Sequence, residues 1–432
     1  MRFSYRLLRG GEGSTTEPLI SSLRMAQIRP FPSSRPAPSR AREVASVPYD
    51  VIDTAEARAL AAGNAASFLH VCRPEIDLPE GTSLYSDPVY AKGRENLDRF
   101  ESDGTLVPDP QPRLLVYRQT WRGASQDGLV AACSVDDYDA DVIRKHEKTR
   151  KDKEDDRTKH LLVQAAHAEP VFLTYRATDA IDARVARVTA APPDIDFEAV
   201  DGVRHTLWVV PEADAGFFVE AFAAIPFLYV ADGHHRSKSA SRACEALAGK
   251  GAVGPDHPVR WFPAAIFPDR ELRILPYNRL VKDLLGRTPE AFLAEVGKAF
   301  HVTEGASAEP SAKGDVRMLL GGRWYALSPK EPVPSDDPIR SLDVSILQER
   351  LLDPLLGIRD PRTDKRVDFV GGIRGTGELE KRVASGEHAV AFSMFPTTVA
   401  ELMAIADAGE TMPPKSTWFE PKLRSGLFVH RF

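Results

Sequence analysis

The sequence predicts an α+β protein of the mixed α/β kind. Apolar runs with strand character recur along the chain. Helical segments with one apolar face alternate with these runs, and one run passes through a tight turn directly into a helix. At 432 residues and 43% hydrophobic, the chain is long enough for two or three cores. A soluble globular protein with several strands and helices is therefore expected.

The helix signals begin with Asp53, which is followed three residues later by Glu56 in the pattern of a capping box. The helix that starts there closes at Gly63. Residues 85–104 place apolar side chains at helical spacing and end in Ser-Asp-Gly. Further helices are predicted over residues 211–224, 288–299 and 339–352.

The strand signals begin with residues 113–119 and 128–135, which flank the turn-like sequence Trp-Arg-Gly-Ala at 121–124. Two strands around such a short turn predict a β-hairpin or meander. Further strands are predicted over residues 171–175, 206–210, 227–230 and 261–267.

The chain is predicted to divide into five stretches. Residues 1–24 are rich in Arg, Ser and Pro, and Met25 opens a more ordinary start, so the first stretch is interpreted as a disordered or misassigned extension. The other stretches are an N-terminal α+β region at 25–205, a region with the strand-turn-helix at 206–327, a proline-rich linker at 328–338 and a C-terminal segment packed on the core at 339–432.

Bulk properties exclude several classes of protein. A net charge of −6 and a pI near 6.0 argue against a general nucleic-acid binder, which would normally carry a basic surplus. The three cysteines are odd in number and widely spaced, which fits a reducing compartment. Because no stretch approaches the ~20 apolar residues of a membrane span, a cytoplasmic protein is expected.

The strongest candidate site is the turn after the strand at 227–230. It consists of Asp232, Gly233, His234, His235 and Arg236. The first N–H groups of a helix are unpaired and carry partial positive charge, and Arg236 can add forked hydrogen bonds to an anion. The turn therefore predicts a phosphate site with Asp232 as the N-cap. The same residues also fit an ordinary turn with an Asp cap and solvated side chains.

A metal site made by His234 and His235 is disfavoured. Adjacent residues of a helix point about 100° apart, and the four-residue spacing of a chelating histidine pair is absent. No cysteine motif supplements the pair. No set of metal ligands is therefore predicted.

A dense charge run covers residues 144–160. Placed on one helix, five basic side chains would share one face, namely His146, Arg150, Lys153, Arg157 and His160. Like charges at this spacing must be offset by acids such as Glu154 or by a bound anion. A solvated helix held by mixed charge pairs is the alternative. Glu147, within the run, is either a general base, a magnesium ligand or an ordinary surface glutamate.

Two weaker signals lie near the C-terminus. Residues 369–377 contain four glycines after a strand end, which can let the backbone approach a phosphate but match no phosphate-binding pattern and also suit a plain turn. Residues 412–426 form a proline-stiffened loop that carries Lys415, Lys422 and Arg424. This loop is interpreted as functional.

Four segments together resemble a bacterial and archaeal family of uncharacterised proteins, a domain-of-unknown-function family with HEKT, DGHHR and PPKST signatures. They are Ile28-Arg29-Pro30-Phe31, His146-Glu147-Lys148-Thr149, Asp232 to Arg236, and Pro414-Lys415-Ser416-Thr417. The likeness covers nearly everything after Met25.

The Asp-Gly-His-His-Arg turn is also similar to the nucleotide-phosphate motif of the ParB and sulfiredoxin superfamily, which includes free-serine kinases. This likeness implies a ParB/sulfiredoxin-like nucleotide-binding core with additional strands and helices. It also implies that residues 232–236 surround a nucleotide phosphate. The turn lacks the reactive cysteine of the sulfiredoxins, which argues against sulfinic-acid repair.

The resulting hypothesis is a nucleotide-dependent phosphotransferase, a kinase that uses ATP or ADP with Mg²⁺ and acts on a small hydroxylated metabolite such as free serine. Asp232 or Glu147 would accept the hydroxyl proton. The nucleotide would be held by Gly233, His234, His235, Arg236, His146, Lys148 and Lys415. The alternative hypothesis is a ParB-like regulatory protein that binds a nucleotide without metabolic turnover.

Overall fold

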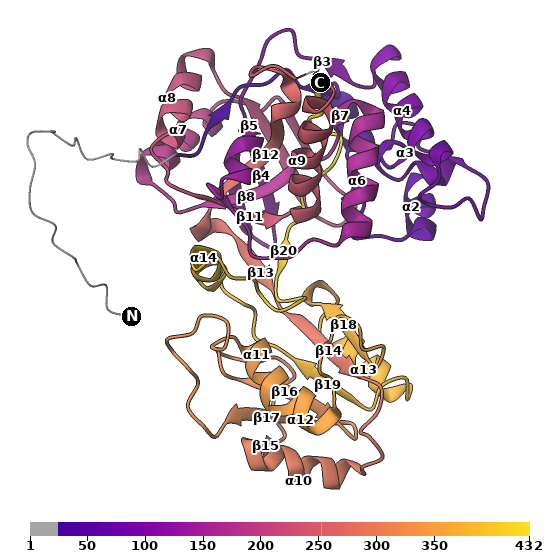
Figure 1. The fold of residues 1–432 in the computed structure, drawn as a ribbon, viewed down its shortest axis with the longest axis vertical. Coiled ribbons are helices and arrows are strands. Elements are labelled where there is room, and N and C mark those ends of the chain that lie inside the picture. The colour runs from indigo at the N-terminus through magenta and orange to yellow at the C-terminus, as the bar shows by residue number, and fades with distance from the viewer. Residues whose placement is uncertain (1–24, 252) are drawn as a thin grey trace, which may run out of the picture.

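The computed structural model describes residues 25–251 and 253–432 (Figure 1). The predicted extension at residues 1–24 lies outside the described residues. The described chain combines helices with two large sheets, which confirms the α+β class. We call the nine-stranded sheet with its helices the large lobe, and the six-stranded sheet with its helices the small lobe.

The large lobe is built on a mixed sheet with the strand order β6-β11-β8-β12-β5-β4-β10-β9, and β1 pairs with β5. The strands are β1 Ile28–Arg29, β4 Leu115–Trp121, β5 Ala124–Ser134, β6 Ile143–Arg144, β8 Val171–Tyr175, β9 Ile195–Glu198, β10 Arg204–Val209, β11 Leu228–Asp232 and β12 Trp261–Pro268. β11 runs parallel to β6 and β8 parallel to β12, and the other pairs are antiparallel.

The predicted hairpin is confirmed as β4 and β5, whose pairing closes at Trp121 and Ala124. Arg122 and Gly123 between them have φ angles of 49° and 76°. Two successive positive φ angles characterise the type I′ turn, which matches the twist of paired strands. The other predicted strands correspond to β8, β10, β11 and β12.

Helices cover one face of the large sheet. α7 (Asp179–Thr189), α8 (Glu212–Phe222) and α9 (His234–Ala248) bury apolar side chains in one cluster with this face. α6 (Lys151–Gln164) packs beside α9, and α4 (Asp87–Ser102) packs on α6. The predicted capping box is confirmed at α2 (Thr54–Ala61), where Asp53 and Glu56 bond reciprocally.

The small lobe contains an antiparallel sheet with the order β15-β17-β16-β19-β14-β18. Its strands are β14 Tyr277–Val281, β15 Phe300–Glu304, β16 Val316–Leu320, β17 Arg323–Pro329, β18 Val367–Gly371 and β19 Val390–Ser393. Its helices are α10 Pro289–Ala299, α11 Asp343–Leu347, α12 Asp353–Leu356 and α13 Gly377–Ala384. The prediction of a helix at 288–299 is confirmed by α10, with Thr288 as its N-cap.

The predicted helix at 339–352 begins later than expected. α11 starts at Asp343, and the helix continues through a π-helical turn into α12. The Asp337 carboxylate accepts hydrogen bonds from the N–H groups of Ile339 and Arg340 at 2.9 Å. This local turn holds residues 337–342 out of the helix.

After β19 the chain returns to the large lobe. α14 (Val399–Asp407) leads to a loop at 411–417, and β20 (Trp418–Glu420) pairs with β13 (Arg273–Leu275) between the lobes (Figure 1). The last residues cross the face of the large sheet opposite α7, α8 and α9, where Leu423, Leu427 and Phe428 are buried. We call residues 394–432 the C-terminal return; it carries Lys415 and Lys422 to the junction of the lobes.

The three cysteines, Cys72, Cys133 and Cys244, are buried and free. Across the described residues, no helix has the length and apolar character needed to cross a membrane.

Candidate functional site

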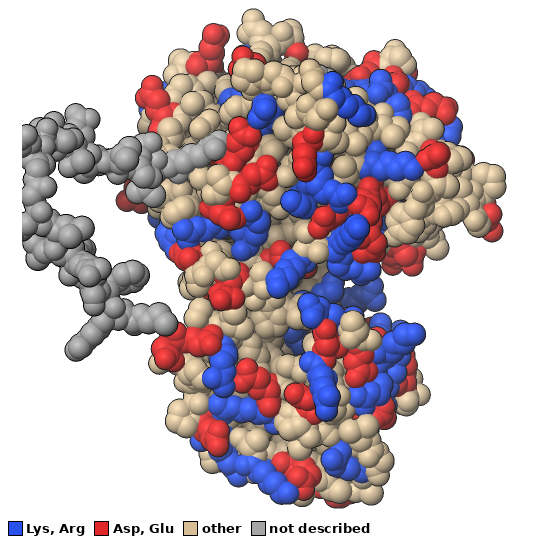
Figure 2. Space-filling view, viewed as in Figure 1, with Lys and Arg blue, Asp and Glu red and all other residues tan. Residues whose placement is uncertain are grey.

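A cavity of about 1210 Å³ lies between the two lobes, and every residue predicted for the site lines it. These residues are His146, Glu147, Lys148, Asp232, Gly233, His234, His235, Arg236 and Lys415. Figure 2 shows the molecule narrowing between the lobes, with Lys and Arg side chains at the narrowed region. The fold therefore brings together three segments that are far apart in the sequence.

Helix α9 presents its N-terminus to this cavity. Its N-cap is Gly233, with φ of 95°, and no side chain caps the helix. The prediction of Asp232 as N-cap is wrong, because Asp232 is the last residue of β11 and the left-handed Gly233 follows it. Only glycine adopts this conformation readily. The uncapped helix start leaves the cavity lined by backbone donors and partial positive charge.

Asp232 holds the turn through several contacts. Its carboxylate accepts hydrogen bonds from the Gly233 N–H at 2.8 Å and from the Lys422 ammonium at 3.0 Å. Arg236 lies 4.0 Å away. Burial alone would raise the pKa of Asp232, but the charges of Lys422 and Arg236 outweigh burial and hold it well below the ordinary value. Asp232 therefore stays ionised and is a weak proton acceptor.

Arg236 points into the protein rather than into the open cavity. Its guanidinium donates to the Pro170 carbonyl and lies 3.6 Å from Asp50. Burial would lower the pKa of Arg236, yet Asp50 and Asp232 together raise it. Arg236 is thus a buried counter-charge that organises the turn, not the forked anion ligand expected from the sequence.

Asp50 and Lys422 also line the cavity, and sequence reasoning did not assign them to the site. Asp50 lies in the loop after α1 (Ala41–Val44), and Lys422 lies in the C-terminal return. Lys422 could have been assigned to the site from the sequence, because Lys415, Lys422 and Arg424 cluster in one proline-stiffened loop. For Asp50 the Pro-Tyr-Asp sequence gave no chemical signal.

The charge run at 144–160 is only partly helical, so the prediction of one helical face is wrong. α6 begins at Lys151, and Arg150 is its N-cap. The Arg150 N–H donates to Nε2 of His235 at 3.0 Å, which ties the segment before α6 to the turn. The five basic residues of the predicted face, His146, Arg150, Lys153, Arg157 and His160, nevertheless line the cavity.

The charges of the run are offset within the protein. Arg157 bonds to Asp156 at 2.7 Å. Glu154 and Asp155 pair with Arg242 of α9 at 3.3 and 2.6 Å, so these two acids join the two helices instead of offsetting the basic face. The acids of the run thus fix α6 against α9 and position the cavity wall.

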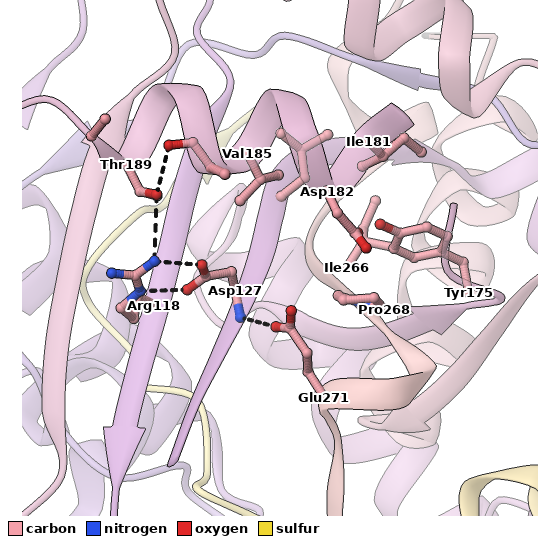
Figure 3. Close-up of a pocket in the computed structure, with 13 residues that line it drawn as sticks. Arg118, Asp127, Tyr175, Ile181, Asp182, Val185, Thr189, Ile266, Pro268 and Glu271 are labelled. Carbon is pink, nitrogen blue, oxygen red and sulfur yellow. Dashed lines mark hydrogen bonds and ion pairs between the residues drawn. The ribbon is translucent and has the colours of Figure 1, made fainter. Parts of the chain in front are cut away.

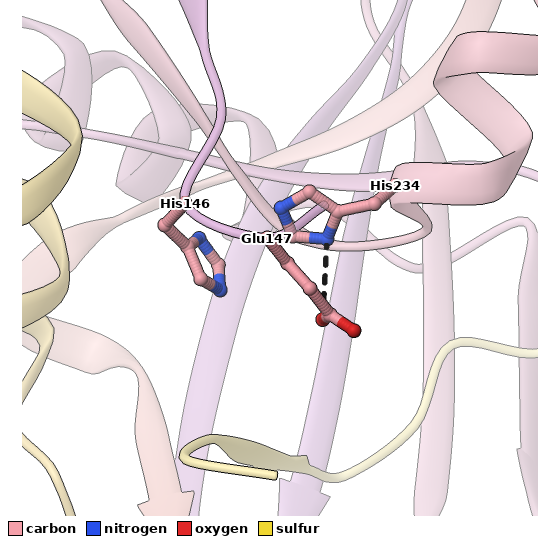
Figure 4. A group of neighbouring side chains, drawn as sticks. All are labelled: His146, Glu147 and His234. Carbon is pink, nitrogen blue, oxygen red and sulfur yellow. Dashed lines mark ion pairs between the residues drawn. The ribbon is translucent and has the colours of Figure 1, made fainter. Parts of the chain in front are cut away.

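His146, Glu147 and His234 form a compact group at the cavity (Figure 4). The rings of His146 and His234 are perpendicular, with centroids 4.4 Å apart. Nδ1 of His234 lies 3.9 Å from the Glu147 carboxylate, and half of the Glu147 side chain is exposed. Burial lowers the pKa of His146 well below its usual value and that of His234 to about 4, so both rings are neutral at pH 7.

Aromatic side chains form the opposite wall. Tyr277, at the start of β14, contacts Trp418 and Phe369 edge-on, with ring centroids 5.2 and 6.2 Å apart. The Lys415 ammonium lies 5.3 Å from the centre of the Tyr277 ring. Sequence reasoning missed this cluster, because its three members come from distant segments. The wall offers flat apolar surface opposite a strongly charged one.

The glycines at 371 and 372 serve packing. A Cβ atom at Gly371 would lie 2.7 Å from Trp418, and one at Gly372 would lie 2.7 Å from Pro276. Both contacts are shorter than real Cβ atoms allow. The close approach of these protein groups accounts for the glycines, so the interpretation as a plain turn is favoured over a phosphate loop.

Residues 28–345 match a described protein family, which covers well over half of the chain. The chain belongs to the family described as Protein of unknown function (DUF1015). The predicted membership of a domain-of-unknown-function family is thereby confirmed. No curated protein shows significant sequence similarity to this DUF1015 chain.

Several solved structures are similar to the DUF1015 chain. A conserved hypothetical protein from Pyrococcus furiosus has 15% identity and a TM-score of 0.33, over 70% of this chain and 95% of that one. A free serine kinase in complex with AMP has 13% identity and a TM-score of 0.35, over 69% and 91%. SbnI from Staphylococcus aureus, truncated at its C-terminus, has 14% identity and a TM-score of 0.36, over 70% and 87%. Likeness at this level says nothing about the ligand of the present chain.

A second cavity of about 350 Å³ lies between α7 and the large sheet (Figure 3). Here Arg118 bonds to both oxygens of Asp127 at 2.7 and 2.6 Å, and Glu271 accepts from the Asp127 N–H at 2.7 Å. These charged groups bond to one another rather than facing an open site. None of the residues predicted for the site lines this cavity.

Proposed function

We propose that this DUF1015 protein is a nucleotide-dependent phosphotransferase that acts on a small hydroxylated metabolite, with free serine as the first substrate to test. The observation that carries the proposal is the convergence of the uncapped α9 N-terminus with Lys148, Lys415 and Lys422 on one cavity. Phosphoryl transfer needs mainly positioning and charge neutralisation, and this arrangement supplies both.

The phosphates would lie at the start of α9. The turn at the start of α9 lines the cavity, and a helix N-terminus favours an anion. Lys148 and Lys415 are exposed to the cavity and would neutralise further charge. Arg236 would act indirectly, because its contacts with Asp50 and Pro170 fix the turn.

The nucleoside would occupy the aromatic wall. Tyr277, Phe369 and Trp418 line the same cavity as the turn, and aromatic rings stack with nucleobases. The cavity volume of about 1210 Å³ exceeds the ~300–1,000 Å³ of ordinary ligand sites. It therefore has room for a nucleotide and a small acceptor together.

The acceptor hydroxyl would be activated on the Glu147 side of the cavity. Asp232 and Glu147 are the two candidates for this step. Asp232 already neutralises Lys422 and holds the turn, whereas half of the Glu147 side chain is exposed to the cavity. Glu147 would act either as the proton acceptor or as a ligand of the ion that activates the hydroxyl. Mg²⁺ bound with the nucleotide would neutralise charge on the transferred phosphoryl group.

The test is a transfer assay on the purified full chain with ATP or ADP, Mg²⁺ and a panel of hydroxylated metabolites that includes serine. A phosphorylated product detected by ³¹P NMR and mass spectrometry is expected. Lys148→Met should lower the rate at least ~10-fold by removing a charge from the phosphate site. Lys298→Met is the matched control, because Lys298 lies on α10, is 71% exposed and does not line the cavity.

The same assay distinguishes the phosphotransferase from the alternative, a regulatory protein that binds a nucleotide without turnover. A protein that binds a nucleotide as a switch would show saturable binding of ATP or ADP with no product from any acceptor. Absence of both binding and transfer would contradict the proposed function altogether.

A further inference from the structure

We propose that His146, Glu147 and His234 bind a divalent first-row transition ion, such as Zn²⁺ or Fe²⁺. This inference deepens the proposed function, since it assigns the role of Glu147, but its evidence is independent of any nucleotide. Each of the three residues offers one ligand atom, and these atoms all lie within 4.8 Å of one another. An ion about 2.1 Å from each ligand atom requires ligand atoms about 3 to 4 Å apart. Small side-chain rotations bring the group to that spacing.

The ring nitrogens of the two histidines are available for an ion. Both ring nitrogens of His146 and Nε2 of His234 are buried and make no well-aligned hydrogen bond within residues 25–251 and 253–432. A buried imidazole nitrogen without a partner costs free energy. The backbone of Val230 lies close enough to accept a hydrogen bond from the His146 ring. A metal-bound histidine commonly donates its second N–H to such a carbonyl.

The local fold holds the two histidines in place. His234 is the first residue of α9, immediately after the left-handed Gly233, and it is 5% exposed. His146 is 2% exposed, and its backbone carbonyl accepts the Met412 N–H at 2.8 Å. Glu147 follows it in the chain and turns toward His234 (Figure 4). Two buried imidazoles and one accessible carboxylate thus form one side of a coordination sphere.

The donor set selects the kind of ion. Imidazole nitrogen suits Zn²⁺, Fe²⁺ and Co²⁺, whereas Mn²⁺, Mg²⁺ and Ca²⁺ prefer sites made of oxygen atoms. Two imidazoles and one carboxylate are three protein ligands, which leaves further positions open toward the cavity. An ion here would stand beside the start of α9 and could contact a phosphoryl or hydroxyl oxygen of a ligand. It would be distinct from the Mg²⁺ that accompanies a nucleotide.

The arrangement also explains why spacing along the chain did not reveal the site. The sequence offered His234 and His235 as neighbours, and their geometry disfavours joint binding. In the fold, Nε2 of His235 instead accepts the Arg150 N–H. The partner of His234 is His146, from a segment 88 residues earlier.

The test measures metal in the purified full chain without nucleotide. After removal of bound metal with a chelator, titration with Zn²⁺, Mn²⁺, Co²⁺ and Mg²⁺ is followed by calorimetry, and the Co²⁺ form by visible absorption. One transition ion per chain with a Kd below about 10 µM is expected, and Mg²⁺ should bind at least ~100-fold more weakly. His146→Ala, Glu147→Gln and His234→Ala should each weaken binding at least ~10-fold.

His235→Gln is the matched control and should keep the stoichiometry and the Co²⁺ spectrum. A second group, formed by Asp368, Glu387 and His388, could also hold an ion, so His388→Ala is measured in parallel. Loss of the ion in His388→Ala, or its retention in His146→Ala and His234→Ala, would overturn the assignment. So would failure of the wild-type chain to bind any transition ion.

Circular dichroism verifies that each variant is folded. If His146→Ala does not fold, Glu147→Gln, at the accessible ligand, and the Co²⁺ spectrum of the wild-type chain still decide the question. The result of the metal titration can be distinguished from the result of the phosphate transfer assay. Metal binding without transfer would leave this site standing and remove the phosphotransferase, and transfer by a wild-type chain that binds no transition ion in the titration would do the reverse.

Discussion

Two buried arginines, Arg236 in the large lobe and Arg279 in the small lobe, are held in different ways. In the large lobe, buried charges face opposite charges: Arg236 lies near Asp50 and Asp232, and Lys422 bonds to Asp232. In the small lobe, Arg279 is buried and donates to the carbonyls of Tyr277 and Lys415, neither of which carries charge. Burial lowers the pKa of Arg279 to about 10.

This difference separates two uses of a buried charge. A network of opposite charges at the turn keeps Asp232 ionised and Arg236 fixed beside a helix N-terminus, which prepares a site for an anion. The single charge of Arg279 holds the backbone of the C-terminal return at Lys415. The large lobe thus supplies the charged wall, while the small lobe positions the loop that faces it.

The largest expected effect follows from removing Arg236. Arg236→Met would leave Asp50 and Asp232 without their buried counter-charge and should cost about 3 kcal/mol of unfolding free energy, measured by urea denaturation at pH 7. Arg362→Met is the matched control in the small lobe. Arg362 also lines the cavity, but its side chain is 62% exposed and pairs with Asp360, so the loss should stay below about 0.5 kcal/mol. Equal losses would show that the buried charge network of Arg236 stabilises the fold no more than an exposed ion pair does.

A smaller effect is expected at Asp343 in the small lobe. Burial raises its pKa from 3.8 to about 6, although the Gly314 N–H donates to the carboxylate. The folded chain therefore binds this proton more tightly than the unfolded chain. Its contribution is fully present below pH 4 and is lost as the pH rises through 6. At pH 7 the ionised, buried carboxylate costs up to about 3 kcal/mol relative to a neutral group.

Asp343→Asn removes this titration, since the amide is neutral at every pH and can still accept the Gly314 N–H. The variant should gain stability over wild type between pH 4 and pH 7, by up to about 3 kcal/mol in urea denaturation. A constant difference across this range would show that Asp343 does not titrate as its burial implies.

Much of the fold was predictable because local signals determined it. The hairpin of β4 and β5, the capping box at Asp53 and the strand-turn-helix at β11 and α9 each depend on residues close together in the sequence. The site residues of the DGHHR, HEKT and PPKST segments were also found from the sequence, and the fold places them on one cavity.

Other features were not predictable because they depend on contacts between distant segments. The capping role given to Asp232 failed because Lys422, from the C-terminal return, and the left-handed Gly233 determine where its carboxylate lies. The single helix expected at 144–160 failed because His235 accepts the Arg150 N–H. The grouping of His146 with His234 required the same contacts between α9 and the segment before α6.

The smallest expected effect separates binding from stability at Lys415. Lys415 has a φ of 57°, a left-handed conformation that disfavours residues with a Cβ atom, and its exposed ammonium faces the cavity. Lys415→Gly and Lys415→Ala both remove the charge, so each should weaken ATP or ADP binding about ten-fold in calorimetry. Only glycine relieves the backbone strain, so the Gly variant should be about 1 kcal/mol more stable than the Ala variant in urea denaturation. Equal stability would show that the loop is unstrained at Lys415, and unchanged affinity in both variants would remove Lys415 from the anion site. Weaker binding together with higher stability in the Gly variant would show that the strained loop is kept for its contact with the ligand and not for the fold.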